Sequence, residues 1–103
     1  MLLVTTERIA GKELQELGMV MGNTVHSKNF IKDFGAGMKS IVGGELKSYT
    51  KMLSEARDVA THRMLEQAAA LGADAVVNVR YSSSAIMQGA AEILATGTAV
   101  KFI

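Results

Sequence analysis

Residues 43–72 read GGELKSYTKMLSEARDVATHRMLEQAAALG, and this stretch decides the fold. Its apolar side chains recur at intervals of three or four, the spacing that places them on one face of an α-helix. The members of this stripe are Leu46, Tyr49, Leu53, Ala56, Ala60, Met64, Ala68 and Leu71. Glycines on both sides of the stripe are typical of helix ends, and the opposite face is charged. We therefore predict one helix from about Glu45 to Leu71, on the order of 40 Å long.

The chain before this helix predicts two strands and a shorter helix. Leu2–Val4 is a short β-prone run, and from Leu17 onward apolar residues alternate with a period of two. One face of this second strand carries Leu17, Met19, Met21 and Val25, and the other carries Val20, Thr24 and His26. Gly18 and Gly22 lie within it, so we expect a bend or a bulge. Residues 28–42 have helical spacing of their apolar side chains and predict the shorter helix.

The chain after the long helix predicts two more strands. Residues Ala73–Ser82 alternate clearly, whereas Ser82–Ala90 is polar and small and is expected to form a loop. The last strand, Ala91–Ile103, is apolar on both faces. One face carries Ile93, Ala95, Ala99 and Ile103, and the other carries Leu94, Val100 and Phe102. Two helices can cover only one face of a small sheet, so the other face needs a partner, and we expect a homo-oligomer that closes as a ring.

The composition indicates one small domain, residues 1–103, because a chain of this length supports a single core. It has 11 basic and 10 acidic residues and no long basic run, which argues against a nucleic-acid partner. The absence of cysteine excludes disulfides and thiolate metal sites. The N-terminal apolar run is too short for a signal peptide or a membrane span. We therefore expect a cytoplasmic protein without a membrane partner.

Several short motifs follow one another along the chain. They are Thr5–Thr6, Asn29–Phe30 with Asp33, Val42–Gly43–Gly44 with Tyr49, Leu71–Gly72–Ala73–Asp74–Ala75–Val76–Val77, and Ala95–Thr96–Gly97–Thr98–Ala99–Val100. Together they resemble the YbjQ family, also called UPF0145, small bacterial and archaeal proteins of unknown function to which heavy-metal binding is ascribed. The resemblance covers essentially the whole chain. It implies a two-layer α+β subunit of the dodecin type, with about four strands packed on one long and one shorter helix, assembled into a pentameric ring.

A candidate site for a divalent metal ion lies on the charged face of the long helix. Glu55, Asp58, His62 and Glu66 follow at spacings of three, four and four, so their side chains form a line that an ion could contact. The alternative is a solvated face, because a helix in water needs charged residues there and carboxylates four residues from a histidine stabilise it slightly. We favour the solvated face, and the metal site remains a hypothesis.

The other chemically suggestive residues have simpler interpretations. His26 has no neighbouring carboxylate in the sequence and is expected to be structural. The pairs Gly35/Gly37 and Gly43–Gly44 lack the lysine and hydroxyl of a phosphate-binding loop. Seven methionines could bind copper(I), but their positions favour filling of the core. The serines at 82–84 have no paired base and are assigned to a loop.

Three classes of function are compatible with these observations. The first is a homo-oligomeric module that binds a metal ion or a small anion at a subunit boundary or in a central cavity. The second is an enzyme in which His26 or His62 works with a carboxylate from a neighbouring subunit. The third is a structural or partner-binding ring. We favour the first, because apolar residues outnumber what a monomer can bury and no activated nucleophile or acid–base pair is evident.

Overall fold

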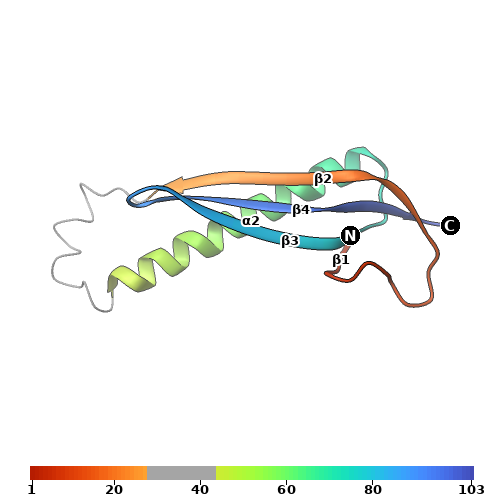
Figure 1. Cartoon of the computed structure of the whole chain (residues 1–103), viewed down its shortest axis with the longest axis horizontal. Coiled ribbons are helices and arrows are strands. Elements are labelled where there is room, and N and C mark those ends of the chain that lie inside the picture. The colour runs from red at the N-terminus through yellow and green to blue at the C-terminus, as the bar shows by residue number, and fades with distance from the viewer. Residues whose placement is uncertain (28–43) are drawn as a thin grey trace.

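The computed structural model describes residues 1–27 and 44–103, so the predicted shorter helix over residues 28–42 lies outside the described residues. The described part has the predicted α+β fold with a sheet of four strands, on which one helix packs where the sequence predicted a long and a shorter one (Figure 1). The elements are β1 (Leu2–Leu3), β2 (Leu14–Ser27), α2 (Gly44–Ala70), β3 (Ala75–Met87) and β4 (Ala90–Phe102). No helix in these residues is both long and apolar enough to cross a membrane.

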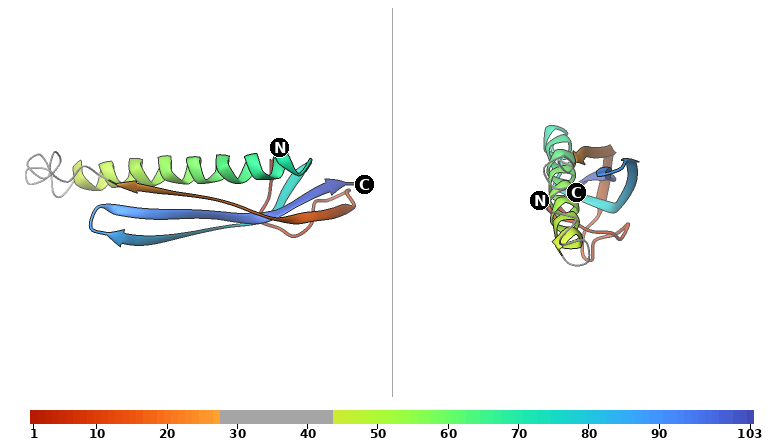
Figure 2. Two further views of the ribbon diagram at one scale, coloured as in Figure 1. Left: turned by 90° about the horizontal axis from the view of Figure 1, so that it is seen from above. Right: turned by 90° about the vertical axis from the view of Figure 1, so that its left-hand side faces the viewer.

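The sheet has the strand order β1-β3-β4-β2, with β4 antiparallel to both of its neighbours and β1 parallel to β3. Helix α2 runs along one face, so the molecule has two layers and measures 56 × 22 × 17 Å (Figure 2). The helix lies mainly over β2, less over β4 and hardly at all over β3. On this face, the helix therefore covers the half of the sheet that contains β2 much better than the half that contains β3.

The long helix confirms most of the predicted apolar stripe. Ala56, Ala60, Met64 and Ala68 are completely buried, and they pack against Val20, Val76, Ala95 and Ala99 of the sheet. Two predicted members of the stripe are wrong, because Leu53 is 38% exposed and Leu71 is 48% exposed. The displacement of α2 toward β2 leaves Leu53 at an open groove between the helix and strands β3 and β4, and Met52 is buried in its place. The helix ends at Ala70, and the glycine predicted to close its last turn, Gly72, follows with φ 76°.

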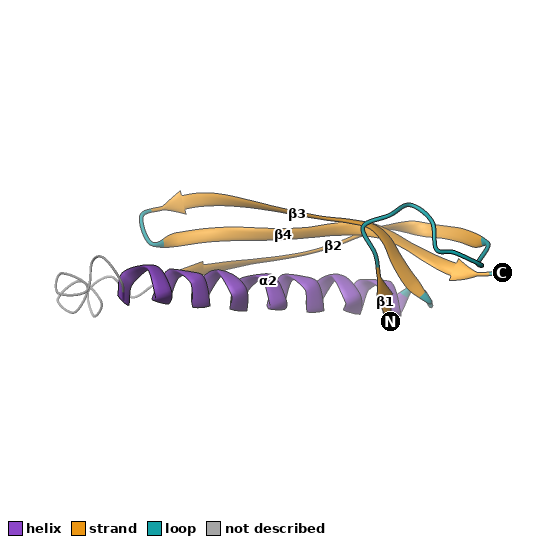
Figure 3. Ribbon diagram, turned by 90° about the horizontal axis from the view of Figure 1, so that it is seen from below, coloured by secondary structure: helices purple, strands orange, loops and turns teal. Residues whose placement is uncertain are grey.

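The face of the sheet opposite α2 is covered at one end by the chain's own N-terminal segment (Figure 3). Val4, Ile9, Leu14 and Phe102 pack there around the buried residues Ala75, Val77 and Val100. The sequence leaves open which face of the last strand needs a partner, and in the structure Val100 on the face with Leu94 and Phe102 is already 1% exposed within the single chain. The loop carrying Ile9 has no periodic pattern, which is why its covering role was not anticipated.

Strand β3 is longer than the sequence predicted. The segment Ser82–Ala90 was expected to be a loop, but β3 continues to Met87 and pairs with β4 as a long hairpin. The turn lies at Gln88–Gly89, where Gly89 has φ 80°. The serines form a strand because the backbone pairs with β4, with Ser82 opposite Leu94 and Ser84 opposite Glu92. Strand β2 begins at Leu14, and its ladder is irregular between Glu16 and Gly18, nearer the start of the strand than the middle, where a bulge was predicted.

Candidate functional site

The four predicted metal ligands lie on the exposed face of α2. Glu55, Asp58, His62 and Glu66 are all exposed, and His62 Nε2 lies 3.5 Å from Glu66 Oε1. No three His, Cys, Asp or Glu side chains in the described part of the chain form a group that could hold a metal ion. The pair His62–Glu66 offers two donors, so a bound ion would need ligands from another molecule or from solvent.

The second histidine, His26, lies near the end of β2 and is partly buried. Its Nδ1 is 3.2 Å from the hydroxyl of Thr24, a buried residue on the same face of the strand. This contact orients the ring within its own strand. An enzyme built on His26 would therefore have to obtain its second catalytic group from elsewhere.

The outer half of β3 is the least covered part of the described sheet. Every residue of Tyr81–Met87, here called the β3 extension, is exposed, although the segment is paired with β4. On its other side β1 pairs only with Ala75 and Val76, so no described strand neighbours the extension there. The extension contains no charged residue and no proline. It is thus an unprotected strand edge, with Ile86 50% and Met87 66% exposed.

The opposite edge of the sheet is covered by the helix. The side chain of Gln67 accepts a hydrogen bond of 3.0 Å from the backbone N–H of Met21. Arg63 donates a hydrogen bond of 2.7 Å to the backbone carbonyl of Asn23. These two bonds occupy polar groups of β2 that a further strand would otherwise use. The two edges of the sheet therefore differ in their availability for pairing.

A shallow groove of about 250 Å³ lies between α2 and the β3 extension. Its lining consists of Leu53, Arg57, Tyr81, Ser82, Ser83 and Ile93. The hydroxyls of Tyr81 and Thr61 are 2.7 Å apart. Because the Thr61 hydroxyl donates to the carbonyl of Arg57, the phenol of Tyr81 donates to Thr61. This bond links the side chains of the helix and the extension directly.

Apolar side chains are also exposed on the face of β2 that points away from the helix. Met19 is 71% exposed, Met21 38% and Val25 55%, so the prediction that these methionines fill the core is wrong. The buried face of β2 carries Val20, Gly22 and Thr24 instead. An alternating strand does not itself reveal which of two apolar faces the helix covers.

Comparison with known proteins relates the whole chain to one group. A YbjQ family model, described as "Putative heavy-metal-binding", matches residues 1–103. A UPF0145 protein of Clostridium novyi is 57% identical over 103 residues, covering all of both chains. A UPF0145 protein of Thermosipho africanus is 58% identical over 102 residues, covering 98% of this chain and 94% of that one.

A solved structure supports the fold. A protein of unknown function from Pediococcus pentosaceus, assigned to the DUF74 family, matches with a TM-score of 0.68. The match covers 100% of this chain and 98% of the other at 12% sequence identity, so it concerns the fold alone. The family model and the two close relatives cover at least 94% of every chain compared. The chain described here therefore belongs to the YbjQ family, UPF0145.

Proposed function

We propose that this chain is the subunit of a cytoplasmic homo-oligomeric binding protein that assembles as a closed ring. The observation that carries this proposal is the β3 extension, Tyr81–Met87, which is exposed on both faces and has no neighbouring strand at its outer edge among residues 1–27 and 44–103. An open edge of this kind readily pairs with another chain. A closed assembly of identical subunits uses every such edge and leaves none for uncontrolled aggregation.

A second copy of the chain suits this surface. The extension has no charged residue, so no unpaired charge would be buried when a strand is added to it. The exposed apolar side chains Ile86 and Met87 lie on it, and Met19 and Val25 are exposed on the uncovered face of β2. Burying three such side chains stabilises an assembly by on the order of 5 kcal/mol per subunit before association costs. The number of five subunits rests on the family resemblance.

The ligand of such a ring is proposed to be a divalent metal ion. The pair His62–Glu66 supplies two donors per subunit, and the family description refers to heavy-metal binding. A ring would bring further donors from a neighbour to each pair. The competing proposals are an enzyme with a site between subunits and a ring that binds no ligand.

The assembly surface is tested with a matched pair of substitutions. Ile86→Lys places a charge on the extension, whereas Leu71→Lys places one on a side chain that is equally exposed, 48% against 50%, after the end of α2. We expect Ile86→Lys to lower the mass measured by sedimentation equilibrium and Leu71→Lys to leave it unchanged. An unchanged mass for Ile86→Lys would show that the extension is not the contact.

A further inference from the structure

Methionine is the only sulfur-containing residue of this chain. The sequence has seven methionines and no cysteine. Cysteine thiolates and methionine thioethers are the sulfur groups of proteins that peroxides oxidise. The thioethers are therefore the only sulfur targets here, and their exposure decides which of them a peroxide reaches first.

The methionines of the described chain differ widely in exposure. Met52 and Met64 belong to α2 and are 7% and 0% exposed. Met19 and Met87 are 71% and 66% exposed. A peroxide in solution therefore reaches the sulfur atoms of Met19 and Met87 in the single chain, whereas the core shields those of Met52 and Met64.

Met87 is the last residue of β3 and belongs to the β3 extension. Ile86 beside it is 50% exposed, and every residue from Tyr81 to Met87 is uncharged. In an extension without charge, the apolar side chains of Ile86 and Met87 favour contact with another chain. A change of Met87 from apolar to polar thus acts directly on the surface that we propose for assembly.

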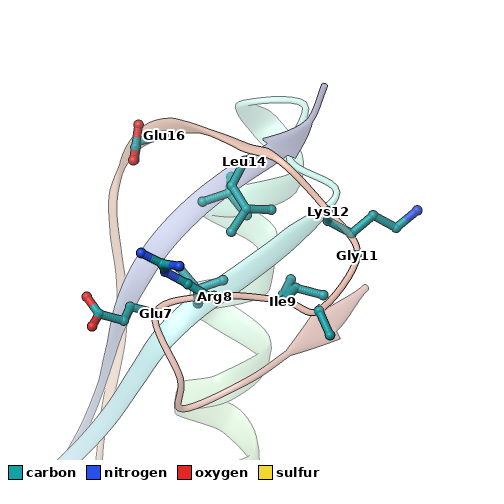
Figure 4. Close-up of a pocket in the computed structure, with 10 residues that line it drawn as sticks. Glu7, Arg8, Ile9, Gly11, Lys12, Leu14 and Glu16 are labelled. Carbon is teal, nitrogen blue, oxygen red and sulfur yellow. The ribbon is translucent and has the colours of Figure 1, made fainter.

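The N-terminal segment covers the other end of β3. Ile9 packs against the buried cluster that contains Val77, and Figure 4 shows its side chain beside this end of the strand. Arg80 donates a hydrogen bond of 2.9 Å to the carbonyl of Thr5. Met87 lies roughly 20 Å beyond Arg80, at about 3.3 Å per residue, so the N-terminal segment leaves it exposed.

Oxidation of a thioether by hydrogen peroxide transfers one oxygen atom to sulfur. The O–O bond of the peroxide breaks, an electron pair of Met87 Sδ forms the new S–O bond, and water is released. Sulfur is thereby oxidised by two electrons and the peroxide is reduced by two. The product is a polar sulfoxide, whose oxygen is costly to bury against apolar side chains without a hydrogen-bond donor.

We infer that Met87 is a reversible oxidation site and that its sulfoxide keeps the subunit out of the assembly. This inference rests on the proposed assembly through the β3 extension. Met87 is covered in the assembled state, so the peroxide reacts with free subunits and prevents their return. The loss of free subunits then draws further subunits out of the assembly by mass action. Methionine sulfoxide reductases regenerate the thioether and with it the contact.

The test is incubation of the purified full chain with hydrogen peroxide at a low and a high protein concentration. Peptide mass spectrometry locates each added oxygen atom, and light scattering gives the mass of the assembly. At low concentration we expect Met87 to be oxidised at least about tenfold faster than Met52 or Met64. At high concentration its oxidation should slow, and the mass should fall only as Met87 is oxidised.

Two outcomes separate this inference from the proposed assembly. An assembly that keeps its full mass while Met87 is oxidised would overturn the inference and leave the assembly standing. A mass of one subunit before any peroxide is added would overturn the proposed assembly, and the inference with it. Treatment of the oxidised protein with methionine sulfoxide reductases should restore the mass, and a failure to do so would contradict reversibility.

Leucine substitutions at the two exposed methionines form a matched pair, because leucine is apolar and has no sulfur. Met87→Leu should keep its mass in peroxide, whereas Met19→Leu should lose mass as the wild-type protein does, although Met19 is similarly exposed. Met87→Gln, which is polar like the sulfoxide, should lower the mass without peroxide. Resistance of Met19→Leu together with sensitivity of Met87→Leu would contradict the assignment. Unchanged far-UV circular dichroism confirms that each variant is folded.

Discussion

Gly22 of β2 and Ala60 of α2 are in such close contact that a side chain at Gly22 would collide with the helix backbone. A Cβ atom built on Gly22 meets the carbonyl oxygen of Ala60 and the backbone nitrogen of Met64. Ala60 and Met64 are completely buried at this contact. The alanine-rich face of the helix thus allows the backbones of α2 and β2 to come into contact. A larger residue at Gly22 or at Ala60 would prevent this close approach.

Replacement of Gly22 by alanine is expected to destabilise the fold. The helix backbone cannot move aside without disturbing the packing of Ala56–Ala68, so we expect a loss of about 3 kcal/mol in the free energy of unfolding. At Gly97 the nearest contact of a Cβ would be the buried side chain of Val76, and the backbone carbonyl of Val77 lies farther away, so Gly97→Ala should cost less than a direct collision with the helix backbone. Urea unfolding at one fixed protein concentration measures the free energy of unfolding of both variants. A smaller loss for Gly22→Ala than for Gly97→Ala would refute the close contact.

Replacement of Ala60 by aspartate is expected to prevent stable folding. Ala60 is 0% exposed and lies in the apolar core, where an unpaired carboxylate costs about 4 kcal/mol or more. Ala69→Asp, on the exposed side of the same helix, is the control and should cost less than about 1 kcal/mol. Circular dichroism during thermal unfolding compares the stability of the two variants with that of the wild-type protein. Wild-type stability of Ala60→Asp would mean that the buried face of α2 has been assigned wrongly.

Asp74 connects the turn after α2 to the last strand. Its carboxylate accepts a hydrogen bond of 2.8 Å from the N–H of Phe102, and its own N–H donates to the carbonyl of Val100 at 2.8 Å. We expect Asp74→Ala to lower the free energy of unfolding by about 1 kcal/mol, because one of these bonds is lost. Asp74→Asn keeps an acceptor oxygen and should retain most of the stability. Equal losses for the two variants would show that the acceptor is unimportant.

Metal binding is expected to depend on His62. If the pair His62–Glu66 binds an ion, His62→Ala abolishes the heat of zinc or nickel binding in calorimetry, whereas His26→Ala leaves it unchanged. The imidazole is the stronger of the two donors for these ions, so its loss should be decisive. If neither the wild-type protein nor the variants bind, the charged face of α2 serves only to solvate the helix.

The regular parts of the fold were predictable because their patterns are long. The helix predicted from about Glu45 to Leu71 is observed at Gly44–Ala70, and the last strand, predicted at Ala91–Ile103, is observed at Ala90–Phe102. The helix has a clear period over many residues, and the last strand is a long β-prone run that is apolar on both faces. The α+β class and the YbjQ family followed from these elements and from the short motifs between them.

The remaining features depend on tertiary contacts that leave little trace in the sequence. Ser82–Ser84 form part of a strand because β4 supplies backbone partners, although serine has no particular preference for strands. The cover over Val77 and Val100 depends on where Ile9 and Leu14 meet the sheet. Neither residue belongs to a periodic run. Of the proposed metal ligands, the structure pairs His62 with Glu66 alone.

The mass of the native protein tests the central proposal most directly. Multi-angle light scattering on untagged wild-type protein at micromolar concentration should give one species of several times the subunit mass of 10.9 kDa. A ring of the expected type corresponds to about five subunits, and native mass spectrometry with elemental analysis would then show whether a stoichiometric metal ion accompanies it. A single species near 11 kDa would contradict the account, because the β3 extension would then remain uncovered in solution.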